Sequence, residues 1–162
     1  MKLENKYVIG CHVMFYEIAM YSEYIDGLIN LLEDIDNKEN VIVDLCFNIS
    51  EKIDRDKISK DELISIFNDG IKRLEKLKIA NIKTRIITPE DGYYFHADYR
   101  RDLNYNYCKE VDFVMHGETD SFFPKEALQS LETLSVYTQT NNIHRYTVCF
   151  ADRKMWDNSW DA

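Results

Sequence analysis

Apolar runs of strand length alternate along the chain with segments whose apolar residues recur at helical spacing. Tyr7–Phe15 and Val41–Phe47 are almost continuously apolar, as expected for strands that are buried on both faces of a sheet. Three further strands are predicted at Ile82–Ile87, Val111–Met115 and Arg145–Ala151. Because strands that alternate with helices form βαβ units, the pattern predicts an α/β fold with a mostly parallel sheet.

The segments between these strands carry helix signals. Ser59, with Glu62 three residues later, fits a capping box at the start of a helix. Glu90–Tyr99 is loop-like, so a short helix is expected at Arg100–Lys109, and Pro124 suits the first turn of a last helix. We expect one domain over residues 1–162. The apolar helical faces contain Met20, Tyr24, Leu28 and Leu32; Leu63, Phe67, Ile71 and Leu74; and Leu128, Leu131 and Leu134.

Composition and charge narrow the classes of partner. Lys and Arg are scattered among acids and the net charge is −9, which argues against a nucleic-acid-binding surface. No apolar stretch approaches the roughly 18 residues of a membrane span and no secretory signal is visible, so we expect a cytoplasmic protein. The absence of a CxxC pair favours buried thiols over a zinc site or disulfides. The cysteines are Cys11, Cys46, Cys108 and Cys149.

Candidate chemistry is sought beyond the carboxyl ends of the strands, where open α/β sheets bind ligands. That rule selects Tyr16-Glu17, Asp44 with Asn48, the loop 88–101 and the segment 116–120. In the last, Glu118 and Asp120 are separated by one residue and follow a predicted strand. Carboxylate oxygens are the ligands that Mg²⁺ and Mn²⁺ prefer. The alternative is a solvated turn in which Asp120 or Ser121 caps the following helix.

Other residues have both a structural and a functional interpretation. His12 lies inside the first predicted strand and is interpreted as a hydrogen-bonded core histidine rather than a ligand. His116 directly precedes the acidic segment and is a weaker candidate for a metal ligand. The Tyr93-Tyr94-Phe95 cluster either covers a bound ligand or packs locally.

Several segments, taken in order, resemble the family-2-like glycosyltransferases of the GT-A fold. Asp112–Asp120 (DFVMHGETD) is similar to that family's strand followed by its Asp-x-Asp motif. Tyr99–Asn104 (YRRDLN) is similar to its Ala-Arg-Asn-x-Gly segment, and Val41–Asn48 (VIVDLCFN) to its second strand motif. The resemblance covers roughly residues 7–135.

This resemblance implies a three-layer, Rossmann-like α/β/α sandwich that binds a nucleotide-diphospho-sugar donor. Mn²⁺ or Mg²⁺ would be held by Glu118 and Asp120, as a Glu-x-Asp variant of the motif, and would bridge to the donor phosphates. Arg101 would contact the diphosphate and Asp44 the nucleotide base. Donor contacts are also implied at Tyr16, Glu17 and Thr119.

The resemblance leaves the acceptor unknown and the chemistry incomplete. A catalytic base is expected well downstream of the acidic motif, where the weak candidates here are Asp157 and Asp161. We therefore expect a fragment or a minimal version of such an enzyme. Two alternatives are a non-catalytic binding or assembly module with this fold, and another divalent-metal nucleotide enzyme such as a nucleotidyltransferase. The oligomeric state is left open, a homo-oligomer included.

Overall fold

The computed structural model describes residues 1–49, 59–79, 81–149 and 154–155. At its centre is an all-parallel sheet with the strand order β3-β2-β1-β4. These strands confirm the first four predicted ones, with small shifts at their ends. Their bounds are β1 (Tyr7–Met14), β2 (Val41–Asn48), β3 (Asn81–Ile87) and β4 (Phe113–Gly117).

The position of each strand in the sheet explains its sequence pattern. β1 lies between β2 and β4, and all of its residues are buried. β2 is the other inner strand, so these two strands are the two continuous apolar runs. β3 and β4 form the edges and keep partly exposed residues.

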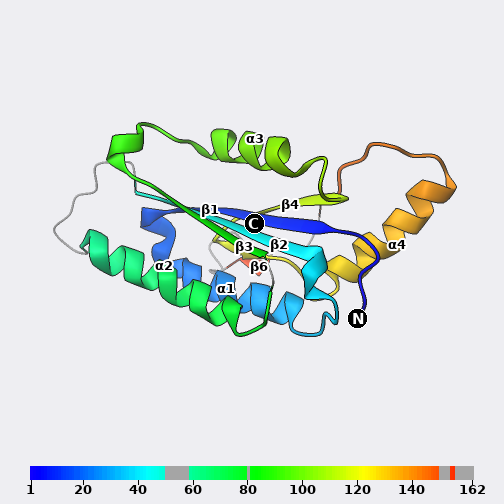
Figure 1. Ribbon diagram of the computed structural model, residues 1–162, viewed down its shortest axis with the longest axis horizontal. Coiled ribbons are helices and arrows are strands. Elements are labelled where there is room, and N and C mark those ends of the chain that lie inside the picture. Colours follow the sequence, from blue (N-terminus) through cyan, green and yellow to red (C-terminus); the bar gives the residue numbers. More distant parts are fainter. Residues whose placement is uncertain (50–58, 80, 150–153, 156–162) are drawn as a thin grey trace.

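Helices cover both faces of the sheet, which gives the expected three-layer α/β/α sandwich (Figure 1). α1 (Ile18–Leu32) and α2 (Lys60–Glu75) lie on one face, and α3 (His96–Tyr107) lies alone on the other. α4 (Ala127–Thr140) begins beside the first face and projects past the amino ends of the strands. The predicted cap of α2 is present, since Ser59 Oγ accepts from the Glu62 amide at 3.2 Å. No helix among the described residues is long and apolar enough to cross a membrane.

Two hydrophobic clusters hold the layers together. The larger one fills the space between the sheet and α1, α2 and the start of α4. The smaller one lies under α3 and includes Val8, Cys46, Tyr99 and Leu103. α3 approaches β1 closely because Gly10 has no side chain: a Cβ there would lie 2.4 Å from Leu103 Cδ2.

Three predictions about the second half of the chain were wrong in detail. α3 begins at His96, inside the segment predicted to be a loop. Pro124 precedes α4 in a turn, where its carbonyl accepts from the Ala127 amide at 2.9 Å. Residues 143–149 are not a strand, and 150–151 lie outside the described residues. A short antiparallel pair was not predicted: β5 (Ser121–Phe122) with β6 (Lys154–Met155).

The cysteines follow the burial of their segments. Cys11 and Cys46 lie in the two inner strands and are buried, as predicted. Burial raises the pKa of the Cys46 thiol to about 11, so it stays protonated. The prediction of buried thiols is wrong for Cys108 and Cys149, which are exposed, since neither belongs to a strand of the sheet.

Candidate functional site

The strand order creates a topological switch point between β1 and β4. The chain moves outward from β1 through β2 to β3, and then returns to the opposite side of β1 to form β4. In open α/β sheets, ligands usually bind between the two connections that diverge at such a point, here those that leave β1 and β4 at the carboxyl edge, and we call this place the crevice. Two segments singled out from the sequence meet here, Tyr16-Glu17 after β1 and 118–120 after β4.

A hydrogen bond joins the two sides of this crevice. Glu17 follows β1 in a short 3-10 turn, where its Oε2 accepts from the Met14 amide at 3.2 Å. The same oxygen accepts from Thr119 Oγ1 at 2.7 Å. Thr119 is buried, with 3% of its surface exposed. Glu17 and Thr119 thus fix the two connections relative to each other, and the Thr119 hydroxyl is already engaged within the protein.

The acidic segment faces a cation from the other layer. Arg100, on α3, lies 2.5 Å from Glu118 Oε1 through its Nη2. Asp120 is half-buried and has no hydrogen bond or ion pair with any residue that the structure describes. His116, the weaker ligand candidate, is exposed on β4, and partial desolvation together with the charge of Arg100 lowers its pKa. The acidic segment therefore brings two carboxylates to the crevice, one of which is paired with a guanidinium.

Gly117 has a packing role beside these residues. A Cβ at Gly117 would lie 2.3 Å from the hydroxyl of Tyr24, which is buried on α1. Only a glycine allows β4 to end this close to α1. The Tyr24 hydroxyl therefore lies against the last residue of β4, directly before Glu118.

The residues present could bind a divalent ion only if a bound ligand supplied further oxygen atoms to its coordination shell. Among the described residues, no group of three His, Cys, Asp or Glu side chains is arranged to hold a metal. Glu118 and Asp120 offer two carboxylates on one turn. Mg²⁺ and related ions are commonly bound in this way, with substrate phosphates completing the coordination shell. The donor set fits a metal–diphosphate complex better than a free ion.

Arg101 and Tyr16, two of the predicted donor contacts, are both largely exposed. Arg101 Nη2 pairs with Asp98 at 2.9 Å on the solvent side of α3, and the arginine side chain is 70% exposed. The arginine that α3 brings to the acidic segment is its neighbour Arg100. Tyr16 is 59% exposed, and its ring contacts Phe15 edge-on at 5.2 Å.

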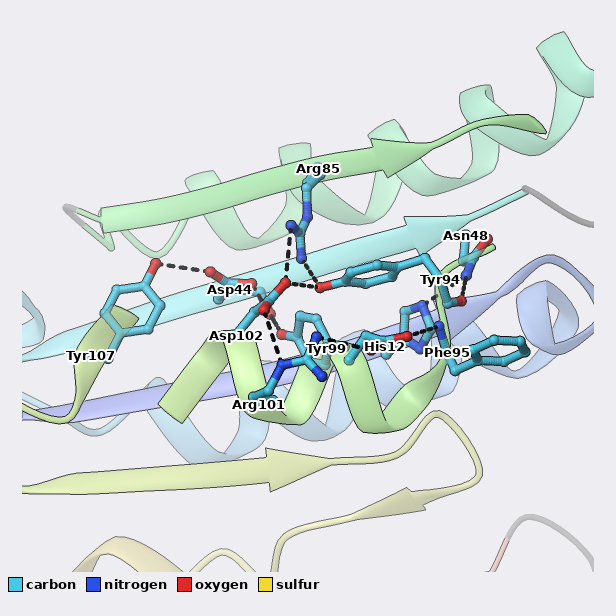
Figure 2. A network of polar contacts seen from close by, with 11 residues as sticks. His12, Asp44, Asn48, Arg85, Tyr94, Phe95, Tyr99, Arg101, Asp102 and Tyr107 are labelled. Carbon is cyan, nitrogen blue, oxygen red and sulfur yellow. Dashed lines mark hydrogen bonds and ion pairs between the residues drawn. The ribbon is translucent and has the colours of Figure 1, made fainter. Parts of the chain in front are cut away.

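Asp44 lies within β2 rather than at its end, and it anchors α3 (Figure 2). Its Oδ1 accepts from Tyr99 Oη at 3.0 Å and its Oδ2 from Tyr107 Oη at 2.8 Å. Burial first, and then the nearby carboxylate, raise the pKa of both phenols, so they remain donors. Asp44 also lines a small cavity of about 180 Å³ with Arg85 and Asp102.

A second polar cluster, not predicted from the sequence, connects β1 and β2 to the loop before α3. Asn48 Nδ2 donates to His12 Nε2 at 3.1 Å and to the Tyr94 carbonyl at 2.6 Å. His12 also stacks on Tyr99 and meets His96 edge-on, at ring-centroid distances of 5.4 and 4.6 Å. The interpretation of His12 as a buried, hydrogen-bonded histidine is confirmed, since 2% of its surface is exposed.

A groove runs along the outer edge of β4, away from β1. It has a volume of about 1040 Å³ and begins beside Arg100 and Glu118. One wall is β4 itself, including His116, and the lining also includes Tyr146 of the segment 143–149, which forms no helix or strand. The groove thus reaches the acidic segment at Glu118. The proposed bases Asp157 and Asp161 lie outside the described residues.

The site could be found only in part from the sequence. Arg100 was missed because the motif comparison aligned Arg101. The spacing of Tyr99, Leu103 and Tyr107 at every fourth residue was the available signal, since it defines the buried face of α3 and places Arg100 beside that face. Comparisons of the chain with protein-family models, with curated proteins and with solved structures gave no match.

Proposed function

We propose that this protein binds a nucleotide-diphospho-sugar in the crevice between β1 and β4 and acts in glycosyl transfer. The observation that carries the proposal is the arrangement of Glu118, Asp120 and Arg100 at a topological switch point. A divalent cation and a guanidinium together can neutralise the charge of a diphosphate, and these three side chains offer two carboxylates for the cation and one guanidinium.

Each residue has a defined task in this proposal. Glu118 and Asp120 would hold the ion, whose charge would offset that of the leaving diphosphate. Arg100, released from Glu118, donates to the phosphate oxygens. Glu17 accepts from Thr119 and so holds the loop that carries both carboxylates. The groove along β4 begins beside Glu118 and offers space for the acceptor.

One observation favours a second function, a binding module without metal chemistry. The Arg100–Glu118 ion pair neutralises one of the two carboxylates. If that pair persists when a ligand is bound, only Asp120 is available for an ion. The protein would then bind an uncharged or zwitterionic ligand in the crevice independently of Mn²⁺.

Calorimetry with UDP, GDP and their glucose conjugates, with and without Mn²⁺, separates the two functions. We expect nucleotide binding that requires Mn²⁺ and that weakens about tenfold or more in Glu118→Gln and in Asp120→Asn. Glu110→Gln is the matched control, because Glu110 is an exposed carboxylate in the turn at the opposite, amino-terminal end of β4. Binding that ignores Mn²⁺ would favour the module. No binding of any nucleotide at millimolar concentration would refute the proposal.

A further inference from the structure

Two aromatic rings of the loop before α3 are held open to solvent. Tyr93 is 82% exposed and Phe95 is 59% exposed. Their rings are parallel within 5° and their centroids lie 6.1 Å apart. An exposed aromatic ring forgoes the stabilisation that burial gives a large apolar side chain. Two such rings side by side form the surface that we call the aromatic platform.

The platform is rigid because the residue between the two rings is fixed. The Tyr94 carbonyl accepts from Asn48 Nδ2 at 2.6 Å. The Tyr94 hydroxyl donates to Asp102 Oδ2 at 2.7 Å, and the Arg85 guanidinium lies over the Tyr94 ring at 4.7 Å from its centroid. In an extended chain, neighbouring side chains point in opposite directions. Anchoring Tyr94 against the protein therefore turns Tyr93 and Phe95 outward.

The start of α3 fixes the other end of the platform. The Phe95 amide donates to Asp98 Oδ2 at 3.0 Å, and α3 begins at the next residue. Figure 2 shows the rings of Phe95 and Tyr94 pointing in opposite directions from the loop. The orientation of both exposed rings is therefore fixed by hydrogen bonds of Tyr94 and of the Phe95 amide.

The distance between the platform and the acidic segment suits the length of a nucleoside diphosphate. Asn48 ends β2 and His12 belongs to β1, so their contacts with Tyr94 and His96 place the loop over the carboxyl ends of these two strands. β2 and β4 are both neighbours of β1, so they are two strand spacings, about 10 Å, apart. A nucleoside diphosphate with its phosphates at the end of β4 can extend its base over β1 to the end of β2.

We infer that Tyr93 and Phe95 stack on the nucleobase of the bound donor. This inference rests on the proposed function, and it adds that the base is held by stacking on the β3–α3 loop, whichever base it is. Stacking on an aromatic face tolerates every base, because each base has a π-face. The platform therefore contributes affinity for the nucleoside part of the ligand and leaves the choice of base to other contacts.

The test compares a ligand that has a base with one that lacks it. Affinities for UDP, for GDP and for inorganic pyrophosphate are measured with Mn²⁺ for the native protein and for the double variant Tyr93→Ala/Phe95→Ala. We expect the affinity for the better-bound nucleotide to fall about 5- to 150-fold, the range for the loss of base stacking. The affinity for pyrophosphate should stay unchanged. Tyr105→Ala is the matched control, since Tyr105 is 84% exposed near the far end of α3.

The outcomes separate this inference from the function on which it rests. An unchanged nucleotide affinity in the double variant overturns the platform while leaving the proposed function intact. An equal loss for nucleotide and pyrophosphate overturns it as well, because the rings would then act through the structure of the site. The conservative variant Tyr93→Phe should keep native affinity for both ligands. If the native protein binds neither nucleotide nor pyrophosphate, both the proposed function and the role of the platform are refuted.

Discussion

Replacing His12 with phenylalanine should remove a large part of the acid sensitivity of the fold. His12 is buried in β1, and burial, together with the charges of His96 and Arg85, lowers its pKa from 6.5 to about 4. Asp98 is the nearby charge that opposes this shift. Because an amide nitrogen only donates, His12 Nε2 accepts from Asn48, and the imidazole is held neutral with its proton on Nδ1.

The direction and size of the effect follow from proton linkage. Between pH 6.5 and about pH 4 the unfolded chain binds a proton at His12 that the folded chain does not bind. The contribution is therefore fully present above pH 6.5 and is lost as the pH falls towards 4. At about 1.4 kcal/mol for each pKa unit, the total is about 3 kcal/mol.

The assay is urea-induced unfolding of the native protein and of His12→Phe at a series of pH values from 4 to 7.5. Phenylalanine keeps a ring against Tyr99 but cannot titrate, so the difference in unfolding free energy between the two proteins should change by about 3 kcal/mol across the series. His144→Asn, at an exposed histidine, is the control. A difference curve that is flat for His12→Phe would refute the claim that His12 is held neutral by the fold.

Two further predictions concern packing and anchoring. Gly117→Ala should lower the unfolding free energy in urea by about 1–3 kcal/mol, because the new methyl group would overlap the buried Tyr24 hydroxyl; an unchanged midpoint would contradict this close approach. Asp44→Ala should cost a similar amount, about 1–3 kcal/mol, since Tyr107 loses its acceptor, whereas Asp44→Asn keeps an acceptor oxygen and should cost less. Calorimetry on Asp44→Asn should give native nucleotide affinity if Asp44 only anchors α3, and a weakened affinity if it contacts the base.

The sheet could be predicted because a strand buried on both faces is a continuous apolar run in the sequence. β1 and β2 are buried on both faces, so nearly every position in them is apolar. Residues 145–149 also include residue types that favour strands, such as Tyr146 and Val148, and yet form no strand. Strand formation there depends on a partner, which is a non-local property that composition does not record.

The start of α3 and the orientation of its arginines were harder to predict. Phe95 at the cap position is not a usual capping residue, so no clear start of the helix could be read from the sequence. In the structure, Asp98 in the first turn accepts from the Phe95 amide. Arg100 and Arg101 are adjacent in sequence, but a helix turns them to different sides. Only the packing of Tyr99 and Leu103 on the sheet decides which arginine meets Glu118.

The central claim is that a metal–nucleotide complex binds at the ends of β1 and β4. Paramagnetic broadening of amide NMR signals tests it most directly, because Mn²⁺ erases the signals of nearby residues. With UDP and Mn²⁺ together, we predict loss of the Glu118, Thr119, Asp120 and Glu17 signals, while that of Glu110 at the opposite end of β4 persists. Broadening that spares Glu118–Asp120, or that appears only elsewhere in the protein, would contradict the account.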